Sequence, residues 1–481
     1  MTAFYFIGAF WLLLALLDLL LKRARSVSRK YERFLDRYGL SVSLGRIVWE
    51  TTKANSLFYP FSRNFLTFQR IWFTCGVYIA LVLMPIGLLV ITYTLVLPFL
   101  SQSGEETVLV PVLPGVTLPW NQIFYFLFAL GLSVIVHEAG HAISAANENV
   151  RIDGIGVFFF LLYPGAYVNL HTEHVTMLPL VGQLRIFCAG IWHNLLLVLA
   201  ALAFLYFLPW LLIPMCRPLD NGVLVAHVAE SSPLIDKLVV GMKIDRVDDC
   251  QVGNRREWAF CLEKIMSQDA RGFCAERLDV ETQDHSIGVI TNHAGVTECC
   301  ENSSLFDFCF SVSVHPKKSA CLHARKFTDA SHCDDPSDCQ GDDPVCLTPH
   351  LDSSSRLFRL ANNPHPDIVY VGSPSLLDQT MLLTDCQPVL SWNALYRLPN
   401  ALEAFLTYLI SLSSALALLN AVPAYFLDGQ WILCAAIEHF LSRAIPCADT
   451  RRRLCSYGLL GGTALLLFTV LLAIKRALVL A

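Results

Sequence analysis

The chain has 481 residues, of which 54% are hydrophobic and only 16% are charged, and its mean hydropathy is +0.51. This composition excludes an ordinary soluble enzyme, whose surface would carry more charged residues. The formal net charge of -5 argues against a nucleic-acid-binding protein, which would present a basic face. The sequence therefore predicts a protein of the lipid bilayer with no nucleic-acid partner.

The first region, residues 1–121, contains two apolar runs separated by a basic segment. Residues 4–21 and 71–100 are each long enough for a membrane-spanning helix. The first run lacks a basic leader and a small-residue cleavage site, so we expect an anchor and not a removed signal peptide. Residues 22–70 are rich in Lys and Arg and contain few acids. Such an excess beside apolar spans is typical of a cytosolic loop, which places residues 101–119 in the lumen.

A motif of ionisable residues lies inside the next apolar segment, residues 122–146. His137, Glu138 and His141 form the pattern His-Glu-x-x-His. Ionisable groups are costly in hydrocarbon, so their presence calls for a functional explanation. On a helix, histidines four residues apart lie on one face and can chelate one zinc ion, and the Glu between them can act as a general base. The motif predicts a zinc hydrolase whose site is embedded in the membrane.

The following apolar run, residues 152–168, has a different character. It is rich in Phe and Val but is interrupted by Gly and Pro. This pattern favours a re-entrant β-like hairpin or short sheet over a spanning helix. Residues 186–215 then form the fourth clear span. We expect residues 122–215 to form the first part of a catalytic membrane core.

Most of the 17 cysteines fall in one long polar region, residues 216–400. They are Cys250, Cys261, Cys274, Cys299, Cys300, Cys309, Cys321, Cys333, Cys339, Cys346 and Cys386. Their density predicts a disulfide-stabilised domain in an oxidising compartment. Reduced thiols or a second zinc site are the alternatives, and the pairing cannot be read from the sequence. A glycosylation acceptor at Asn302 fits a lumenal face.

The polar region begins like a PDZ domain, a module that binds extended peptides by strand addition. Residues 222–234 alternate as a strand and lead into a Ser-Pro helix start, and residues 240–245 read as a glycine turn and a second strand. The Cys-rich part, about residues 250–346, would then be an insertion, and residues 367–372 a later strand that completes the sheet. The alternative is an ordinary small β-domain without a peptide groove.

The last region, residues 401–481, contains two more spans, residues 402–422 and 459–473. Alternating the spans places the basic loops in the cytosol and the polar region in the lumen, with the amino terminus also in the lumen. Three cysteines have no assigned role and are interpreted as small residues on the membrane side: Cys188, Cys434 and Cys447.

A catalytic zinc ion needs about three protein ligands and an open position. Asp428 is the acid at the end of the fifth span, and the topology places it at the same depth as the two histidines. Pro423 would interrupt the helix, and Gly429 would allow close backbone approach. Asp428 is therefore the predicted third ligand. The alternative is a structural acid at a helix end near water.

These motifs together resemble the site-2 protease family of intramembrane zinc metalloproteases. The matching segments are His-Glu-Ala-Gly-His at 137–141, Ala-Gly-Ile-Trp-His-Asn at 189–194, Asn-x-x-Pro at 420–423 and Leu-Asp-Gly at 427–429. The Cys-rich insertion resembles the animal members more than the bacterial ones. The short polar stretch at residues 101–107 stands where some vertebrate members carry a long serine run.

The resemblance implies roles for five residues. His137, His141 and Asp428 would hold Zn²⁺, and Glu138 would be the catalytic base. Asn194 would help to hold the substrate or the tetrahedral oxyanion, with a buried polar residue that bonds between helices as the alternative. The implied fold is a polytopic α-helical membrane protein with a membrane-embedded zinc site, a re-entrant β-like hairpin and a lumenal PDZ-like domain that carries a Cys-rich insertion.

The implied activity is that of a metalloendopeptidase of class EC 3.4.24 in the Golgi membrane. Its substrates would be membrane-anchored transcription factor precursors, such as sterol regulatory element-binding proteins and the activating factors of the unfolded-protein response. A first lumenal cut by another protease would precede cleavage of the transmembrane helix and release of the cytosolic domain. The PDZ-like domain would act as a size filter, and the hairpin at 154–165 would offer a strand edge to the unwound substrate. An ion transporter, a lipid hydrolase and an inactive scaffold are the alternatives.

Overall fold

The computed structural model describes residues 2–24, 27–53, 55, 58, 66–100, 112, 118–268, 271–288, 290–291, 297–301, 307–313, 318–362, 365–390 and 392–480. Asn302 and the polar stretch at residues 101–107 lie outside the described residues. The chain divides into two compact units. One, called here the helical unit, comprises Met1–Phe207 and Glu403–Ala481, and the other, the disulfide-rich unit, comprises Leu208–Leu402.

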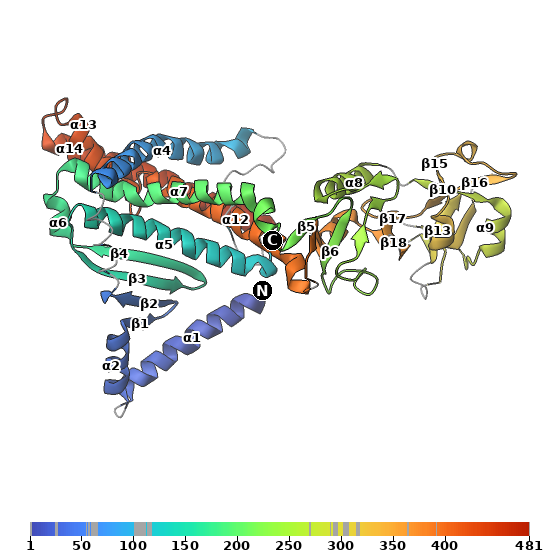
Figure 1. Cartoon of the computed structure of the whole chain (residues 1–481), viewed down its shortest axis with the longest axis horizontal. Helices are drawn as coiled ribbons and strands as arrows, with labels where there is room; N and C mark the ends of the chain where they lie inside the picture. Colours follow the sequence, from blue (N-terminus) through green and yellow to red (C-terminus); the bar gives the residue numbers. More distant parts are fainter. Residues whose placement is uncertain are drawn as a thin grey trace. The chain divides into compact units, whose positions relative to one another are not determined.

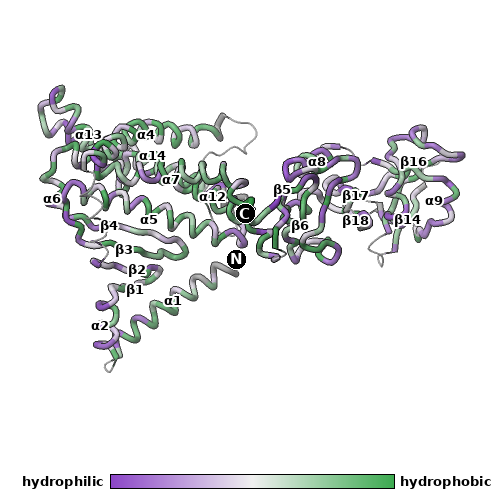
Figure 2. The backbone as a smooth tube through the Cα atoms, viewed as in Figure 1, coloured by the Kyte–Doolittle hydropathy of each residue, from purple (hydrophilic) through white to green (hydrophobic). Residues whose placement is uncertain are grey.

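Long apolar helices account for the hydrophobic composition of the chain. They are α1 (Thr2–Arg23), α4 (Leu66–Leu100), α5 (Ile123–Asn147), α7 (Leu180–Leu212), α12 (Asn393–Ala421) and α14 (Ala448–Leu480). Hydrophobic residues cover most of α4 and α7, as Figure 2 shows. Within the described part of the chain, five helices are long and apolar enough to cross a bilayer. This agrees with the prediction of a multi-pass membrane protein.

Two of the differences between the helix boundaries and the predicted spans affect the interpretation of the sequence. Helix α14 begins at Ala448, so the arginines at 451–453 lie in its first turns and not in a loop. Helix α12 ends at Ala421, and a separate helix, α13 (Asp428–Leu441), begins at Asp428. Asp428 therefore begins a helix of its own after the interruption predicted at Pro423, instead of lying at the end of the fifth span. Pro423 explains the break, because its ring and its missing N–H do not fit a helix interior.

A four-stranded antiparallel sheet lies beside α5 (Figure 1). Its strands are β1 (Leu40–Ser43), β2 (Arg46–Thr51), β3 (Ile152–Phe160) and β4 (Tyr163–Leu170), in the order β1-β2-β3-β4. The β3–β4 pair confirms the hairpin predicted at residues 152–168. The basic segment contributes more than a loop, because it forms α2 (Ser28–Tyr38) and the first two strands. Gly39 joins them with a φ of +65°, and a methyl group there would lie 1.9 Å from the Glu50 carbonyl oxygen, so only glycine fits.

Small residues allow the helices of the helical unit to pack closely. Ala80 of α4, Ala417 and Ala421 of α12 and Ala435 of α13 are buried in one apolar cluster with Ile191 of α7. Short side chains let helix backbones approach, which is how helices associate in an apolar solvent. The packing therefore fixes α13, which carries Asp428, relative to α4, α7 and α12.

The disulfide-rich unit has two hydrophobic cores. The first core underlies two sheets, with orders β18-β17-β8-β9 and β19-β6-β7, and the second underlies the sheet β14-β13-β16-β10-β15. Its larger strands and helices are β6 (Val223–Val228), α8 (Arg255–Ser267), β10 (Gly272–Glu276), α9 (Arg277–Gln283), β13 (Asp307–Val312), β14 (Lys318–His323), β16 (Pro344–Pro349), β17 (Arg356–Asn362), β18 (His365–Gly372), α11 (Pro374–Thr380) and β19 (Met381–Thr384). Its shorter elements are β5 (Cys216–Pro218), β7 (Lys243–Ile244), β8 (Arg246–Val247), β9 (Cys250–Gln251), β11 (Ile290–Thr291), β12 (Thr297–Glu298), α10 (Ala324–Phe327), β15 (His332–Cys333), η3 (Pro336–Asp338) and β20 (Cys386–Pro388).

Two expectations about this unit can be compared with the strands. The predicted strand at residues 367–372 lies in β18, which pairs with β17 and so joins the sheet of β8 and β9. Strand β6, the predicted opening strand, is instead flanked by β19 and β7. The second core lies within residues 272–357, which overlaps the predicted insertion. The likeness to a PDZ domain stays a prediction.

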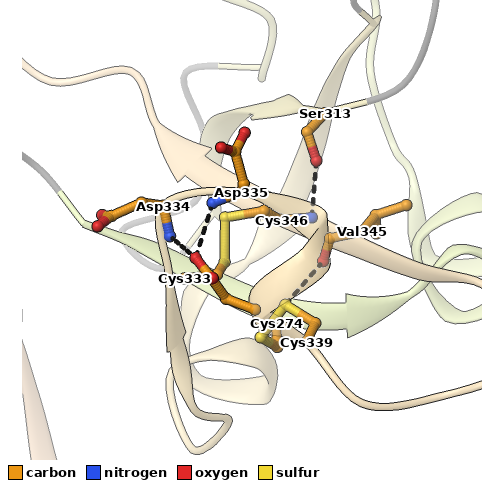
Figure 3. Close-up of a disulfide and its surroundings, with 9 residues drawn as sticks. Cys274, Ser313, Cys333, Asp334, Asp335, Cys339, Val345 and Cys346 are labelled. Carbon is orange, nitrogen blue, oxygen red and sulfur yellow. Dashed lines mark hydrogen bonds between the residues drawn. A yellow bond between two sulfur atoms is a disulfide. The ribbon is translucent and has the colours of Figure 1, made fainter.

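Disulfides join fourteen cysteines. The pairs are Cys216–Cys386, Cys250–Cys261, Cys274–Cys339, Cys299–Cys309, Cys300–Cys321, Cys333–Cys346 and Cys434–Cys455. Figure 3 shows Cys274–Cys339 beside Cys333–Cys346, and because all four sulfurs are bonded in disulfides, this group does not offer free thiolates to a second metal. The interpretation of Cys434 as a small residue with no role is wrong, because it forms a disulfide with Cys455 of α14, which the sequence does not place beside α13.

Candidate metal centre and catalytic cavity

Two histidines of α5 and one aspartate of α13 come together in the helical unit. The Nε2 atoms of His137 and His141 lie 3.2 Å apart, as expected for residues one turn apart on one face of a helix. Asp428 Oδ2 lies 3.0 Å from His137 Nε2 and 3.3 Å from His141 Nε2. Asp428 reaches them because it is the first residue of α13, where the chain turns after Pro423. The ligand atoms of the three residues predicted to bind the metal therefore lie close enough together to contact one ion.

The chemistry of this donor set fits a divalent cation. His141 Nδ1 lies 2.8 Å from the Ile186 carbonyl oxygen, which can only accept, so Nδ1 donates, and in the neutral imidazole Nε2 then carries the lone pair. That lone pair faces a carboxylate oxygen and a second imidazole nitrogen. Among the described residues, buried Asp428 Oδ2 has no hydrogen-bond partner with acceptable geometry. Tetrahedral zinc with bonds of about 2.0–2.1 Å would hold such ligand atoms roughly 3.3 Å apart, close to the spacing seen here.

Two glycines provide the space for this arrangement. A methyl group at Gly190 of α7 would lie 2.5 Å from His137 Cε1 and 2.5 Å from His141 Nε2. A methyl group at Gly429 would lie 2.0 Å from the Val422 carbonyl oxygen. Both distances are too short for any side chain. Gly190 therefore leaves room for the two imidazoles, and Gly429 allows α13 to begin close to the end of α12.

Glu138 faces a cavity beside the three candidate ligands. The cavity has a volume of about 590 Å³ and is lined by Glu138, His141 and Asp428 together with apolar residues such as Val168 and Trp431. The backbone N–H of Val168 in β4 donates to the Glu138 carboxylate. The cavity thus brings together a carboxylate suited to general base catalysis, the candidate metal ligands and one strand of the hairpin.

Asn194 contacts the centre from the opposite side of the His137 ring. Its side chain is fully buried, and its amide nitrogen is placed 3.1 Å from His137 Nδ1. The hydroxyl of Ser413 in α12 donates to the Asn194 backbone carbonyl at 3.4 Å. His193 points elsewhere and contacts the Ala189 carbonyl oxygen, so it belongs to the helix packing. The oxyanion role for Asn194 stays a prediction, and the observed contact favours a role in holding His137.

Some functional residues could not be found from their own sequence pattern. Ile186 contributes a backbone carbonyl, and Val168 contributes a backbone N–H, and neither group depends on the side chain. Gly190 acts by lacking a side chain, and one glycine among 26 gives no sign of its neighbours. Only the four-residue spacing of Ile186, Gly190 and Asn194 on one face of α7 could have indicated that they act together.

Comparison with known proteins adds an independent observation. Residues 125–459 match peptidase family M50. The chain is also 28% identical over 449 residues to the membrane-bound transcription factor site-2 protease homolog of Arabidopsis thaliana, and the likeness covers 80% of this chain and 84% of the plant protein. The segment that matches the family begins within α5 and ends within α14, so it includes all five predicted site residues.

Proposed function

The chain belongs to peptidase family M50 and is an intramembrane metalloprotease; on this premise we propose that His137, His141 and Asp428 hold its zinc ion and that Glu138 is its catalytic base. The observation that carries the proposal is the convergence of two imidazole nitrogens and one carboxylate oxygen within 4.8 Å of one another. The His₂-carboxylate set leaves a fourth position open for water, as catalytic zinc requires.

The residues around the centre have distinct tasks in this mechanism. A zinc ion held by His137, His141 and Asp428 would supply Lewis acidity, which would lower the pKa of the attacking water and polarise the scissile carbonyl group. Glu138 takes the proton of the attacking water and returns it to the leaving amine. The Val168 N–H holds the Glu138 carboxylate at the cavity wall, which limits the rotamers that the base can adopt.

The substrate backbone has to be extended at the point of cleavage, because a helical amide is hydrogen-bonded and sterically shielded. Strand β4 is suited to receive it. It pairs with β3 along one edge, and within the described residues no strand pairs with its other edge. An extended peptide can add to such an edge through main-chain hydrogen bonds. The apolar part of the cavity lining suits side chains from a transmembrane helix.

The proposed substrates are membrane-anchored transcription factor precursors, including sterol regulatory element-binding proteins and the activating factors of the unfolded-protein response. The name of the plant relative, a membrane-bound transcription factor site-2 protease homolog, supports this class. Six of the disulfides lie in the disulfide-rich unit, which supports a lumenal location for it and a Golgi setting for the protein. We further propose that this unit is PDZ-like and admits only substrates already shortened by a lumenal protease.

The test is cleavage of a transmembrane reporter, already trimmed on its lumenal side, by protein reconstituted in liposomes. Glu138→Gln should retain one zinc ion per chain and lose at least about 100-fold in cleavage rate, because the general base is removed while the ligands remain. Glu173→Gln, the same change at an exposed position of α6 (Thr172–Met177), is the matched control and should cleave normally. Unchanged cleavage by Glu138→Gln would refute the assignment, and a lipid hydrolase would leave the reporter intact.

A further inference from the structure

One face of α7 meets the candidate zinc centre on three successive turns. Ile186, Gly190 and Asn194 are spaced by four residues and therefore lie above one another on the helix. Ile186 contacts His141 Nδ1 through its carbonyl oxygen, Gly190 leaves room for both imidazoles, and Asn194 contacts His137 Nδ1 through its amide. Each imidazole thus has its Nε2 directed at the centre and its Nδ1 directed at α7.

The chemistry of the imidazole determines what α7 has to supply. A neutral histidine that binds a metal through Nε2 carries its proton on Nδ1, so Nδ1 must donate to an acceptor. For His141 the acceptor is the Ile186 carbonyl oxygen at 2.8 Å. For His137 the group at 3.1 Å is the amide nitrogen of Asn194.

The alternative amide orientation gives His137 Nδ1 the acceptor that it lacks. With the nitrogen toward the ring, Asn194 Oδ1 is buried and has no partner among the described residues. Rotating the amide by half a turn exchanges its oxygen and nitrogen, which are assigned from the hydrogen-bond network. Asn194 Oδ1 then accepts from His137 Nδ1–H, so that His137 gains the acceptor that its role as a ligand requires.

We propose that Asn194 is a positioning residue that fixes the tautomer and orientation of His137 by accepting the Nδ1 proton in a hydrogen bond. This inference rests on the proposed zinc centre. The Asn194 side chain is fully buried and lies on the far side of the ring from Nε2, so its amide is committed to His137. The bond from Ser413 to the Asn194 backbone and the close contact at Gly190 hold this part of α7 against α12 and α5.

Zinc affinity measured in the Glu138→Gln background tests the proposal without reference to cleavage. The dissociation constant would be obtained by competition with a chelator, and the coordination geometry from the visible absorption of the Co²⁺-substituted protein. Asn194→Ala should weaken zinc binding by about 10–100-fold, the usual effect of losing an outer-shell partner, and should change the cobalt spectrum. Asn194→Asp keeps an acceptor oxygen at the same place and should bind zinc within a few-fold of the parent.

Ser413→Ala is the matched control, because it removes a buried hydrogen bond beside Asn194 that does not reach His137. It should leave zinc affinity and the cobalt spectrum unchanged. Thermal unfolding of the zinc-free proteins identifies a variant that has lost its fold. If Asn194→Asp does not fold, the comparison of Asn194→Ala with Ser413→Ala still tests whether Asn194 positions His137.

Two other results would contradict the positioning role of Asn194. If Asn194 contacts the oxyanion, Asn194→Ala in the active background binds zinc normally but loses about 100–1,000-fold in kcat, and Asn194→Asp loses as much. That pattern overturns the positioning role and leaves the zinc centre intact. If the parent protein itself binds no zinc through His137, the proposed centre fails, and the role of Asn194 fails with it.

Discussion

Replacing Gly190 by alanine would place one methyl group between the two imidazoles without removing any ligand. The new Cβ would lie 2.5 Å from His141 Nε2 and 2.6 Å from His137 Nε2. Non-bonded carbon contacts are optimal at about 3.5–4.0 Å, so the rings or α7 must move by about 1 Å. The rings cannot turn away easily, because each is held at Nδ1.

A displacement of this size is large for a metal site. Zinc–ligand distances tolerate about 0.2 Å, and a shift of about 1 Å at a reacting group lowers rates by about 100-fold. Gly190→Ala should therefore lose at least about 100-fold in zinc affinity and in cleavage of a transmembrane reporter. Zinc content after gel filtration and initial cleavage rates in liposomes measure both effects.

Gly131→Ala is the matched control on α5. The new methyl group would meet only Pro164 Cγ, at 3.9 Å, which is an ordinary contact. Alanine is a better helix former than glycine by about 0.5–1 kcal/mol, so this variant should bind zinc and cleave normally and should be slightly more stable. If Gly190→Ala folds, retains one zinc ion per chain and cleaves at the wild-type rate, the proposed centre is wrong.

Three further predictions concern the metal, a buried acid and the disulfides. Removing zinc with a chelator should abolish reporter cleavage, and Zn²⁺ but not Mg²⁺ should restore it, because the donor set contains two imidazoles. Burial raises the pKa of the Asp248 carboxyl. The backbone N–H of Arg359 donates a hydrogen bond to this carboxyl and partly offsets the rise in its pKa. The folded state is therefore favoured as the pH falls through this raised pKa, and Asp248→Asn should raise the unfolding temperature more at pH 8 than at pH 4. Cys216→Ser opens a loop with a sequence separation of 170 and should cost about 5 kcal/mol by loop entropy, whereas Cys299→Ser opens one of 10 and should cost about 3 kcal/mol.

Each of these predictions has a result that contradicts it. Full activity after complete zinc removal would exclude zinc from the reaction. An equal change of unfolding temperature at both pH values would show that the charge of Asp248 does not oppose folding. Equal destabilisation by the two cysteine variants, measured by thermal unfolding of the full chain, would show that loop length does not govern these disulfides.

The sequence by itself determined the features that depend on local periodicity. Helical spacing placed His137 and His141 on one face, and the cost of charge in hydrocarbon singled out Glu138 as a candidate functional residue. Runs of apolar residues located the long helices, and Pro423 located the break before Asp428. These inferences succeed because the interacting residues are close in sequence, or because composition alone decides whether a segment prefers lipid.

The tertiary structure decided everything that depends on which distant segments touch. It brought β2 of the basic segment against β3 and paired Cys434 with Cys455. It also directed Ile186 and Asn194 of α7 toward the Nδ1 atoms of the two histidines. Such contacts use backbone groups, buried amides and the absence of a side chain, so the same residues could serve many other roles. The sequence predicts which atoms would bind zinc, but only the packing of α7 against α5 shows how those atoms are held in place.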